Sequence, residues 1–315
     1  MKFKILFLLV LFVQGFMYSQ ISVGNLYFPQ VRVKSGRLPE ELLASLKATT
    51  TLFVIRNKDK NKLEDFKTAF QNTWSFNPLK VISQSEIGKY EGKPGYSFIT
   101  VSAYINTGSV NAVDFFLEYW LPVLKREEKS KETISLIQLY SDDASQSAIV
   151  SLRYADGLKE LAPTTNDLAD FFNLTPGLAK CYLKFMNNQL DQAQPHAMCK
   201  NESNPELLYS LKKDTLCIPE YVLKSGITDA GIKENYPFPY KILDQATLDL
   251  KITKSRSNLY VLSYVFVNRS TKFITVFNAQ TGEILYSYNN MEGDSSKPIT
   301  EKDFSKLSKK IKGAE

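Results

Sequence analysis

The chain has 315 residues, of which 43% are hydrophobic, and a formal net charge of +6. This length is sufficient for two modest domains or one large one. The 39 basic and 33 acidic residues are spread along the chain. Because a nucleic-acid-binding protein needs a clustered basic face or a recognisable motif, this composition argues against that class.

The first twenty residues have the three regions of a secretory signal. Two lysines precede the apolar run Ile5–Phe12, and the polar residues Tyr18–Gln20 can hold a cleavage site. The alternative is a membrane anchor, but Gln14 interrupts the run before the roughly 20 apolar residues that a spanning helix needs. We therefore expect cleavage near Ile21, no attached lipid, and an extracytoplasmic location, either periplasmic or secreted.

An internal similarity organises the rest of the chain. The run PLKVISQS at Pro78–Ser85 recurs as PYKILDQA at Pro239–Ala246, a shift of 161 residues. Two further pairs of strand-rich runs follow: Ser97–Tyr104 with Asn258–Val265 and, after a small gap, Thr51–Ile55 with Thr215–Pro219. The pattern predicts two related halves, with chance similarity as the alternative.

The first half begins with an ill-defined lead-in over Ile21–Thr49, which contains a candidate short helix at Pro39–Lys47. A strand, a helix and a strand follow it. Thr51–Ile55 is a continuous apolar run, typical of a strand that is buried on both faces. Helical spacing over Leu63–Phe70 follows two N-capping residues, and Leu79–Ile82 is the next strand. The short connections predict parallel pairing of the two strands.

The remainder of this half is predicted to be antiparallel. Trp120 and Pro122 mark the end of the middle strand, because proline cannot donate to an interior ladder. The charged run Lys125–Glu132 is read as a solvated hairpin tip. The three strands are expected at Tyr96–Tyr104, Val113–Tyr119 and Thr133–Tyr140.

A helical segment separates the halves. Leu168, Phe171 and Phe172 indicate a first helix, and Leu178, Cys181 and Phe185 share one face of a second. Asn204 caps a further helix that starts with Pro205. Three strands with a hairpin loop at Asn278–Gly282 then close the second sheet. The strands of the second half are predicted at Thr215–Ile218, Tyr240–Leu243, Leu259–Val267, Phe273–Phe277 and Ile284–Tyr288.

The C-terminal segment predicts an amphipathic helix. Thr300 and Asp303 form a capping-box pattern, followed by an apolar stripe at Phe304, Leu307 and Ile311 with lysines around it. A lid on the second sheet is favoured over a membrane-seeking helix, because three apolar residues bury little area. The fold class is α/β to α+β, with a signal peptide at 1–20, a first half at 21–155, a helical connector at 156–213 and a second half at 214–315.

The chain offers little for catalysis. His196 is the single histidine, so sites that need two imidazoles are excluded. Metal-protease, serine-hydrolase and phosphate-loop motifs are absent. Acidic pairs such as Asp142 with Asp143, and Asp167 with Asp170, are ordinary on solvated loops. No catalytic, cofactor-binding or metal-ligating residue is therefore assigned, and no cofactor is expected.

The three cysteines form an odd set for an exported chain. Cys181 lies on the apolar helix face and is the expected buried thiol. Cys199 and Cys217 flank a polar segment and form a candidate disulfide, for which a free-thiol pair is the alternative. Cys199 and His196 are too weakly supported as a nucleophile pair, because no third group is evident.

The order of a strand, a helix, a strand and then antiparallel strands resembles the small α/β domains of some bacterial envelope assembly proteins, such as the N-terminal domain of the Tol translocation protein. This likeness of pattern, without a diagnostic motif, implies an envelope role. We expect an exported, non-catalytic protein that binds an envelope protein or polymer, and neither nucleic acid nor, in the mature chain, a membrane span. The alternative is a hydrolase that works through paired carboxylates.

Overall fold

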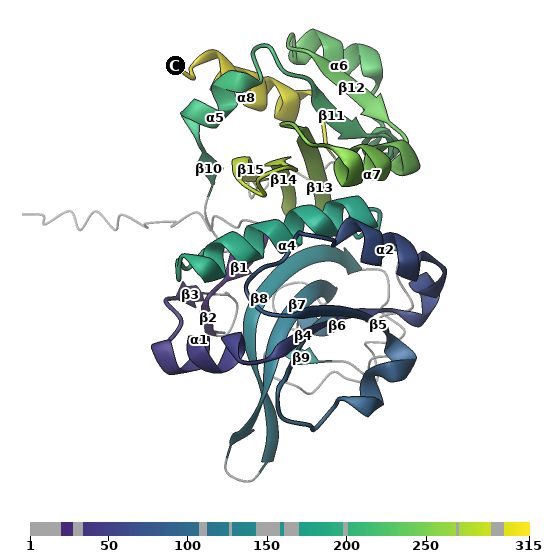
Figure 1. Cartoon of the computed structure of the whole chain (residues 1–315). Coiled ribbons are helices and arrows are strands. Elements are labelled where there is room, and N and C mark those ends of the chain that lie inside the picture. Colours follow the sequence, from purple (N-terminus) through teal and green to yellow (C-terminus); the bar gives the residue numbers. More distant parts are fainter. Residues whose placement is uncertain are drawn as a thin grey trace, which may run out of the picture.

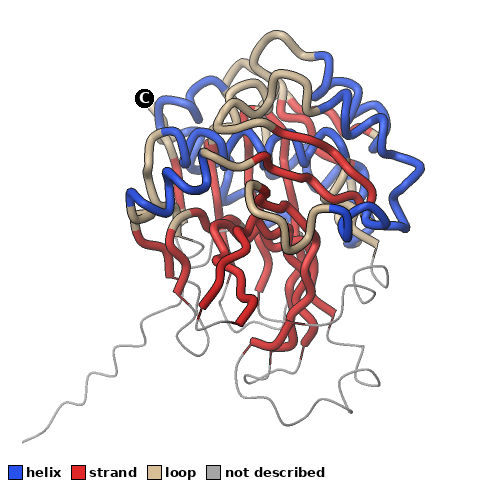
Figure 2. The backbone as a smooth tube through the Cα atoms, turned by 60° about the horizontal axis from the view of Figure 1, so that its bottom comes forward, coloured by secondary structure: helices blue, strands red, loops and turns tan. Residues whose placement is uncertain are grey.

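The computed structural model describes residues 20–27, 34–106, 112–125, 128–142, 158–160, 170–197, 201–268, 271–290 and 299–315. The described chain forms two mixed α/β halves, each built on its own sheet, with a long helix between them (Figure 1). Figure 2 traces the same backbone with its helices packed against the strands.

The first sheet has the strand order β1-β8-β7-β6-β4-β5, with β9 paired to β6. β4 is parallel to both β5 and β6, and every other pairing in this sheet is antiparallel. The strand bounds are β1 (Ile21–Val23), β4 (Thr50–Ile55), β5 (Leu79–Ser83), β6 (Tyr96–Asn106), β7 (Ala112–Lys125), β8 (Glu128–Asp142) and β9 (Leu158–Glu160).

Short helices and one hairpin complete the first half. Phe66 and Phe70 of α2 pack on Phe53 of β4, with ring centroids 5.7 and 4.7 Å from the Phe53 ring. Burial of this aromatic face holds α2 on the sheet. The elements are the β2–β3 hairpin (Asn25–Tyr27 and Lys34–Gly36), α1 (Glu40–Lys47), η1 (Asn57–Lys62), α2 (Leu63–Ala69) and η2 (Gln84–Lys89).

The second sheet has the order β10-β15-β14-β13-β11-β12, with β11 parallel to β12 and β13. Its strands are β10 (Glu202–Ser203), β11 (Leu216–Pro219), β12 (Tyr240–Leu243), β13 (Tyr260–Asn268), β14 (Thr271–Asn278) and β15 (Ile284–Asn290). Its helices are α5 (Pro205–Ser210), η5 (Glu220–Ser225), α6 (Asp229–Asn235), α7 (Gln245–Lys254) and α8 (Glu301–Lys312).

The two halves have the same topology. The first sheet becomes the second when β1, β8, β7, β6, β4 and β5 are replaced by β10, β15, β14, β13, β11 and β12. The amide of Thr51 donates to the carbonyl of Pro78, and the amide of Leu216 donates to the carbonyl of Pro239 in the same way. The predicted equivalence of the strands Leu79–Ile82 and Tyr240–Leu243 is therefore confirmed.

The strand register corrects two details of the predicted alignment. Thr51 lies opposite both Leu79 and Ser97, whereas Leu216 lies opposite both Tyr240 and Tyr260. Thr51 thus corresponds to Leu216 rather than to Thr215, and Ser97 corresponds to Tyr260 rather than to Asn258. The physical reason for the second shift is that the connection containing α7 is two residues longer than the one containing η2.

Helix α4 (Pro176–Asp191) lies between the two sheets (Figure 1). Its N-cap Thr175 accepts a hydrogen bond from the Leu178 amide, and Pro176 occupies the first helical position. One buried hydrophobic cluster joins α4 to both sheets and includes Tyr182, Phe53 and Phe277. The predicted connector therefore packs on both sheets, and β10 and α5, which follow α4, pack on the second one.

Two predicted strand ends differ from the structure. β7 does not end near Trp120 but runs to Lys125, through Pro122. β6 pairs with β7 only as far as Trp120, so Pro122 lies where β7 has become an edge and no ladder bond from its nitrogen is needed. The charged run Lys125–Glu132 is mostly strand, and it includes the pair Lys125–Glu128.

The lead-in predicted to be ill-defined is also structured. It contains β1, which pairs with β8, and the β2–β3 hairpin. Its candidate helix at Pro39–Lys47 is confirmed as α1. Ile21 and Val23 are fully buried. By contrast, Phe171 and Phe172 lie outside any helix, in and beside a turn, while Leu168, which was expected to share their helix, falls outside the described residues.

The C-terminal helix α8 agrees with its prediction. Thr300 and Asp303 form the reciprocal capping box. Phe304, Leu307 and Ile311 are buried in the second core, against the second sheet. Lys302, Lys309, Lys310 and Lys312 are exposed, while the half-buried Lys306 donates a hydrogen bond to the Tyr288 hydroxyl group. The helix is therefore a lid on the sheet.

Candidate functional site

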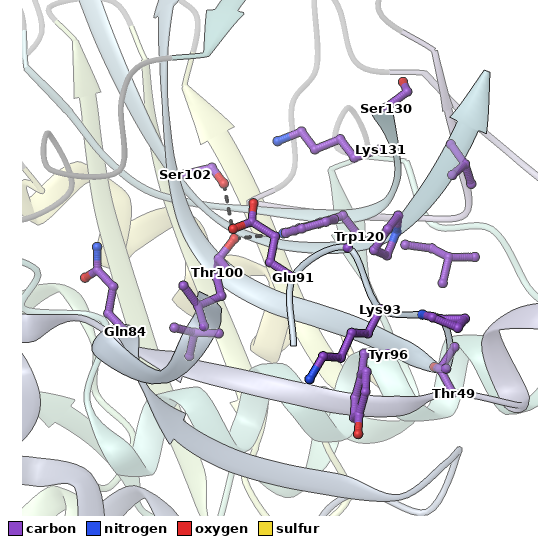
Figure 3. A pocket seen from close by; sticks show the side chains of 18 of the residues that line it. Thr49, Gln84, Glu91, Lys93, Tyr96, Thr100, Ser102, Trp120, Ser130 and Lys131 are labelled. Carbon is purple, nitrogen blue, oxygen red and sulfur yellow. Dashed lines mark hydrogen bonds between the residues drawn. The ribbon is translucent and has the colours of Figure 1, made fainter. Parts of the chain in front are cut away.

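A groove in the first half runs over the sheet face that carries Phe98 and Trp120, which is turned away from α4 (Figure 3). Its lining also includes Val101, Leu121 and Val123, which belong to or pack against the core cluster shared with α4. Its volume is about 1310 Å³, which exceeds the roughly 300–1,000 Å³ of ordinary small-molecule pockets. Residues of η2 and the loop after it, of β6, and of the β7–β8 hairpin line it: Gln84, Ile87, Glu91, Lys93, Tyr96, Thr100, Ser102, Trp120, Pro122, Ser130 and Lys131 are among them.

The floor of the groove combines an indole with two hydroxyl groups. The Trp120 ring stacks on Phe98 of the adjacent strand, with centroids 4.6 Å apart. Trp120 Nε1 donates to Thr100 Oγ1 at 3.0 Å, and Thr100 lies 3.4 Å from Ser102 Oγ along the same strand face (Figure 3). Pairing across the β6–β7 ladder therefore holds the indole in a fixed orientation.

A buried carboxylate supports this floor from the adjoining part of the same face. Glu118 has no exposed surface and accepts hydrogen bonds from Tyr104 Oη at 2.9 Å, Thr133 Oγ1 at 2.6 Å and Lys131 Nζ at 2.8 Å. The Lys131 ammonium also lies 5.9 Å from the Trp120 ring centroid. Three donors and full burial make Glu118 a structural anchor for Lys131 rather than a reactive acid.

The wall formed by η2 is aromatic and polar. Ser83 and Glu86 close a reciprocal capping box at the start of η2. Tyr90 packs edge-on against Tyr96, with ring centroids 5.0 Å apart, and its hydroxyl group accepts a hydrogen bond from Lys80 that raises the lysine pKa. Lys80 lies on the η2 face of the edge strand. Its repeat equivalent Lys241 lies on the corresponding α7 face of β12, as predicted.

Among the described lining residues, Glu91 is the single carboxylate. A carboxylate-dependent hydrolase needs two acids flanking the reacting bond. Trp120 does line the site, whereas Trp74, the other tryptophan, lies on the opposite sheet face, where its Nε1 donates to Asn77. The groove thus offers a surface for binding rather than an acid pair.

The sequence-derived acidic pairs are not brought together at this site. Asp170 is exposed and forms a 2.6 Å ion pair with Lys58, which lowers the carboxyl pKa. Asp142 ends β8, and its partner Asp143 lies outside the described residues, as does Asp167, the partner of Asp170.

Cys181, Cys217 and His196 do not line the groove. Cys181 is fully buried on α4, and burial raises its thiol pKa to about 12. Cys217 is buried on β11, where burial also raises the pKa. Cys199 falls outside the described residues, so the Cys199–Cys217 disulfide stays a prediction. His196 Nδ1 lies 2.9 Å from the Ile21 carbonyl oxygen, which places the ring in a structural contact with β1.

No family model, curated protein or solved structure matches the chain. Within the described ranges, no helix is both long and apolar enough to cross a membrane. The same part of the chain contains no group of three or more His, Cys, Asp and Glu residues that could hold a metal ion.

The polar residues of the groove follow a pattern in the sequence, although they belong to no recognised motif. Along β7 the polar signal is limited to Glu118, which has apolar and aromatic neighbours, whereas Thr100, Ser102 and Tyr104 alternate with apolar residues along β6. Such alternation predicts one polar face for β6. It does not tell which strands are neighbours, so the site emerges only when the ladder places Trp120 beside Phe98.

Proposed function

We propose that this protein is an exported, non-catalytic binding protein that holds a segment of an envelope protein or polymer in the groove of its first half. The observation that carries the proposal is the groove itself, about 1310 Å³ in volume and floored by Trp120, Thr100 and Ser102. Its size and length suit an extended ligand, and its indole and hydroxyl groups supply both apolar contact and directional hydrogen bonds.

The described residues fill the space between the two halves, because α4 and both sheets share one hydrophobic cluster there. We therefore do not place the binding site in that space. The edge strands of both sheets are short, because β1 has three residues, β5 five, β10 two and β12 four. The groove is therefore the site that the geometry favours.

Export is part of the proposal and rests on the charge and hydropathy pattern of residues 1–20. Gln20 and Ile21 are fully buried, and the Gln20 side chain donates to the Gln138 carbonyl and to the Tyr182 hydroxyl. Cleavage much beyond Ile21 would remove β1 from the sheet. N-terminal sequencing of the native protein is expected to give a start close to Ile21.

The binding proposal is tested by affinity capture with a charge reversal in the groove. Lys93 lines the groove and is exposed, so Lys93→Glu alters the site without opening the core. Lys233 on α6 is equally exposed and lies outside the groove, so Lys233→Glu is the matched control. Tagged chains are incubated with envelope extract, and the retained molecules are quantified by mass spectrometry.

We expect the Lys93→Glu variant to lose a molecule that the native chain and the Lys233→Glu variant both retain. Equal recovery by all three chains would remove the groove from consideration. Turnover of a glycan or peptide library that disappears in the Glu91→Gln variant would instead favour the hydrolase.

A further inference from the structure

The sheet face that carries the groove in the first half is occupied in the second half. β13 and β14 are the equivalents of β6 and β7, and the pair Val261–Phe277 stands where Phe98–Trp120 stands in the first sheet. In the second half α7 covers one side of this face, and α4 packs alongside α7 over the remainder. The structure therefore contains one example of how this face binds a helix.

The helix is held there by a tyrosine. Tyr182 of α4 lies with its hydroxyl oxygen 3.1 Å from Ser263 Oγ, and its ring meets Phe277 edge-on with centroids 5.7 Å apart. Lys180 adds two hydrogen bonds from its ammonium to the carbonyls of Ile252 and Thr253, near the C-terminal end of α7. A ring between a hydroxyl group and an aromatic side chain thus fixes α4 on the face.

The groove repeats this arrangement without a described helix in it. Thr100 is the equivalent of Ser263 and Trp120 the equivalent of Phe277, while η2 stands in the place of α7. A hydroxyl group has one donor and two acceptor positions. Thr100 accepts from Trp120 Nε1 and lies within hydrogen-bond distance of Ser102 Oγ, which leaves one position of its hydroxyl group for a further polar partner.

We infer that the groove is the docking site for an amphipathic helix of a partner protein, which presents an aromatic side chain to Thr100 and Trp120 as α4 presents Tyr182 to the second half. This inference rests on the proposed function and names its ligand class. The groove is more polar than the α4 face, because Ser102 and Glu118 stand where the second half has Val265 and Thr275. The hydroxyl and aromatic pair is common to both faces, so a peptide with the sequence of α4 is a suitable probe for that contact.

A second copy of this chain does not supply that helix. α4 is buried between the sheets, so it cannot bind another copy without unfolding. α8, its equivalent in the second half, faces outward with Lys302, Lys309 and Lys310 and has its apolar side chains buried. It carries no outward aromatic ring for Trp120. Tyr209 of α5 is exposed, but α5 has only six residues and is too short to span the groove as an amphipathic helix. Among the described helices none fits the groove, and the ligand is therefore a helix from a different protein.

The experiment uses the full chain with Trp74→Phe, which leaves Trp120 as its single tryptophan and places a fluorescent reporter in the groove. The probe is a synthetic peptide of residues 173–193 with Cys181→Ser. Two control peptides carry, in addition, Tyr182→Ala or the helix-breaking change Lys184→Pro. Titration of Trp120 emission is expected to give a dissociation constant at least tenfold lower for the first peptide than for either control.

A double-mutant cycle locates the contact. Tyr182→Phe in the peptide and Thr100→Val in the protein each remove one hydroxyl group, and the cycle cancels the effect of Thr100→Val on Trp120 itself. We expect the two changes to be coupled by about fivefold or more in affinity. Equal binding of all three peptides, unchanged Trp120 emission, or independent effects in the cycle would overturn the inference.

The outcomes separate this inference from the proposed function. If Lys93→Glu abolishes capture of a natural ligand while the helical peptide binds no better than its controls, the groove still binds a ligand and the helix inference is wrong. If Lys93→Glu changes nothing, the proposed function fails as well. Self-association that disappears in a Trp120→Ala chain, measured by sedimentation, would show a second copy as the occupant and contradict the choice of a different protein.

Discussion

A substitution of Gly282 measures how closely the second half packs on α4. Gly282 lies in the β14–β15 loop with φ at +78°, and a Cβ atom added there would lie 2.5 Å from Lys184 Cβ and 2.8 Å from the backbone carbonyl carbon of Lys184. Gly282→Ala therefore meets two penalties. The left-handed backbone costs an alanine about 1–2 kcal/mol, and the collision with the helix adds roughly 1–3 kcal/mol.

Gly226 provides the matched control, because its φ is +94° and a Cβ atom added there meets nothing within 4 Å. Gly226→Ala should lose only the backbone contribution of about 1–2 kcal/mol, whereas Gly282→Ala should lose about 2–5 kcal/mol in total. The free energy of unfolding is measured in urea by tryptophan fluorescence and by circular dichroism, since agreement of the two signals is needed for a two-state treatment. Equal losses in the two variants would refute the close approach of this loop to α4.

Three further predictions concern buried polar groups. Asp303→Ala, which leaves the buried Lys272 without the carboxylate 2.5 Å away, is expected to cost about 3–5 kcal/mol in urea unfolding, and a loss below 1 kcal/mol would contradict this pairing. Burial raises the pKa of Asp249, so its contribution to stability is greatest below pH about 4 and is lost as the pH rises through the raised pKa. The Asp249→Asn variant should lack that part of the pH dependence, and identical pH profiles would contradict the assignment. The Cys181 thiol, with its pKa raised to about 12, should resist a thiol reagent at pH 8 until the protein is unfolded, and rapid labelling of Cys181 in the folded chain would show that the site opens.

Local patterns in the sequence predicted those strands and helices in which the buried residues recur at a regular spacing or form one continuous run. The alternating strands of the second half, the continuous run Thr51–Ile55 and the apolar stripe of α8 all lie as expected. α7 escaped this reasoning, because Leu248, Leu250 and Ile252 alternate like residues of a strand. The N-cap favours a helix, because the Asp244 side chain accepts a hydrogen bond from the Thr247 amide. Leu248 and Ile252 are buried one helical turn apart, whereas Leu250 is 53% exposed.

Elements that depend on distant partners could not be predicted from their own residues. β1 has three residues and exists because Ile21 and Val23 pair with β8, more than a hundred positions away. The groove likewise depends on the order of strands, since the neighbours of Trp120 come from β6 and from the far end of the β7–β8 hairpin. The repeat indicated which strands of the two halves are equivalent, because related segments of one chain occupy related places. It did not give their order: β6 and β13 were expected beside β5 and β12, but they pair with β4 and β11 instead.

The way the halves stack on α4 explains why the equivalent faces of the two sheets differ, one being open and the other covered by a helix. Each half has a face covered by its own last helix, α4 or α8, and an opposite face crossed by the connection to its third parallel strand. α4 is apolar on both sides and joins its own sheet to the open face of the next half. α8 is apolar on one side only and presents lysines outward, so the stack stops there, as terminal units of repeat proteins do. The open face of the first half has no preceding helix among the described residues, and for this reason the groove is the surface on which we place the ligand.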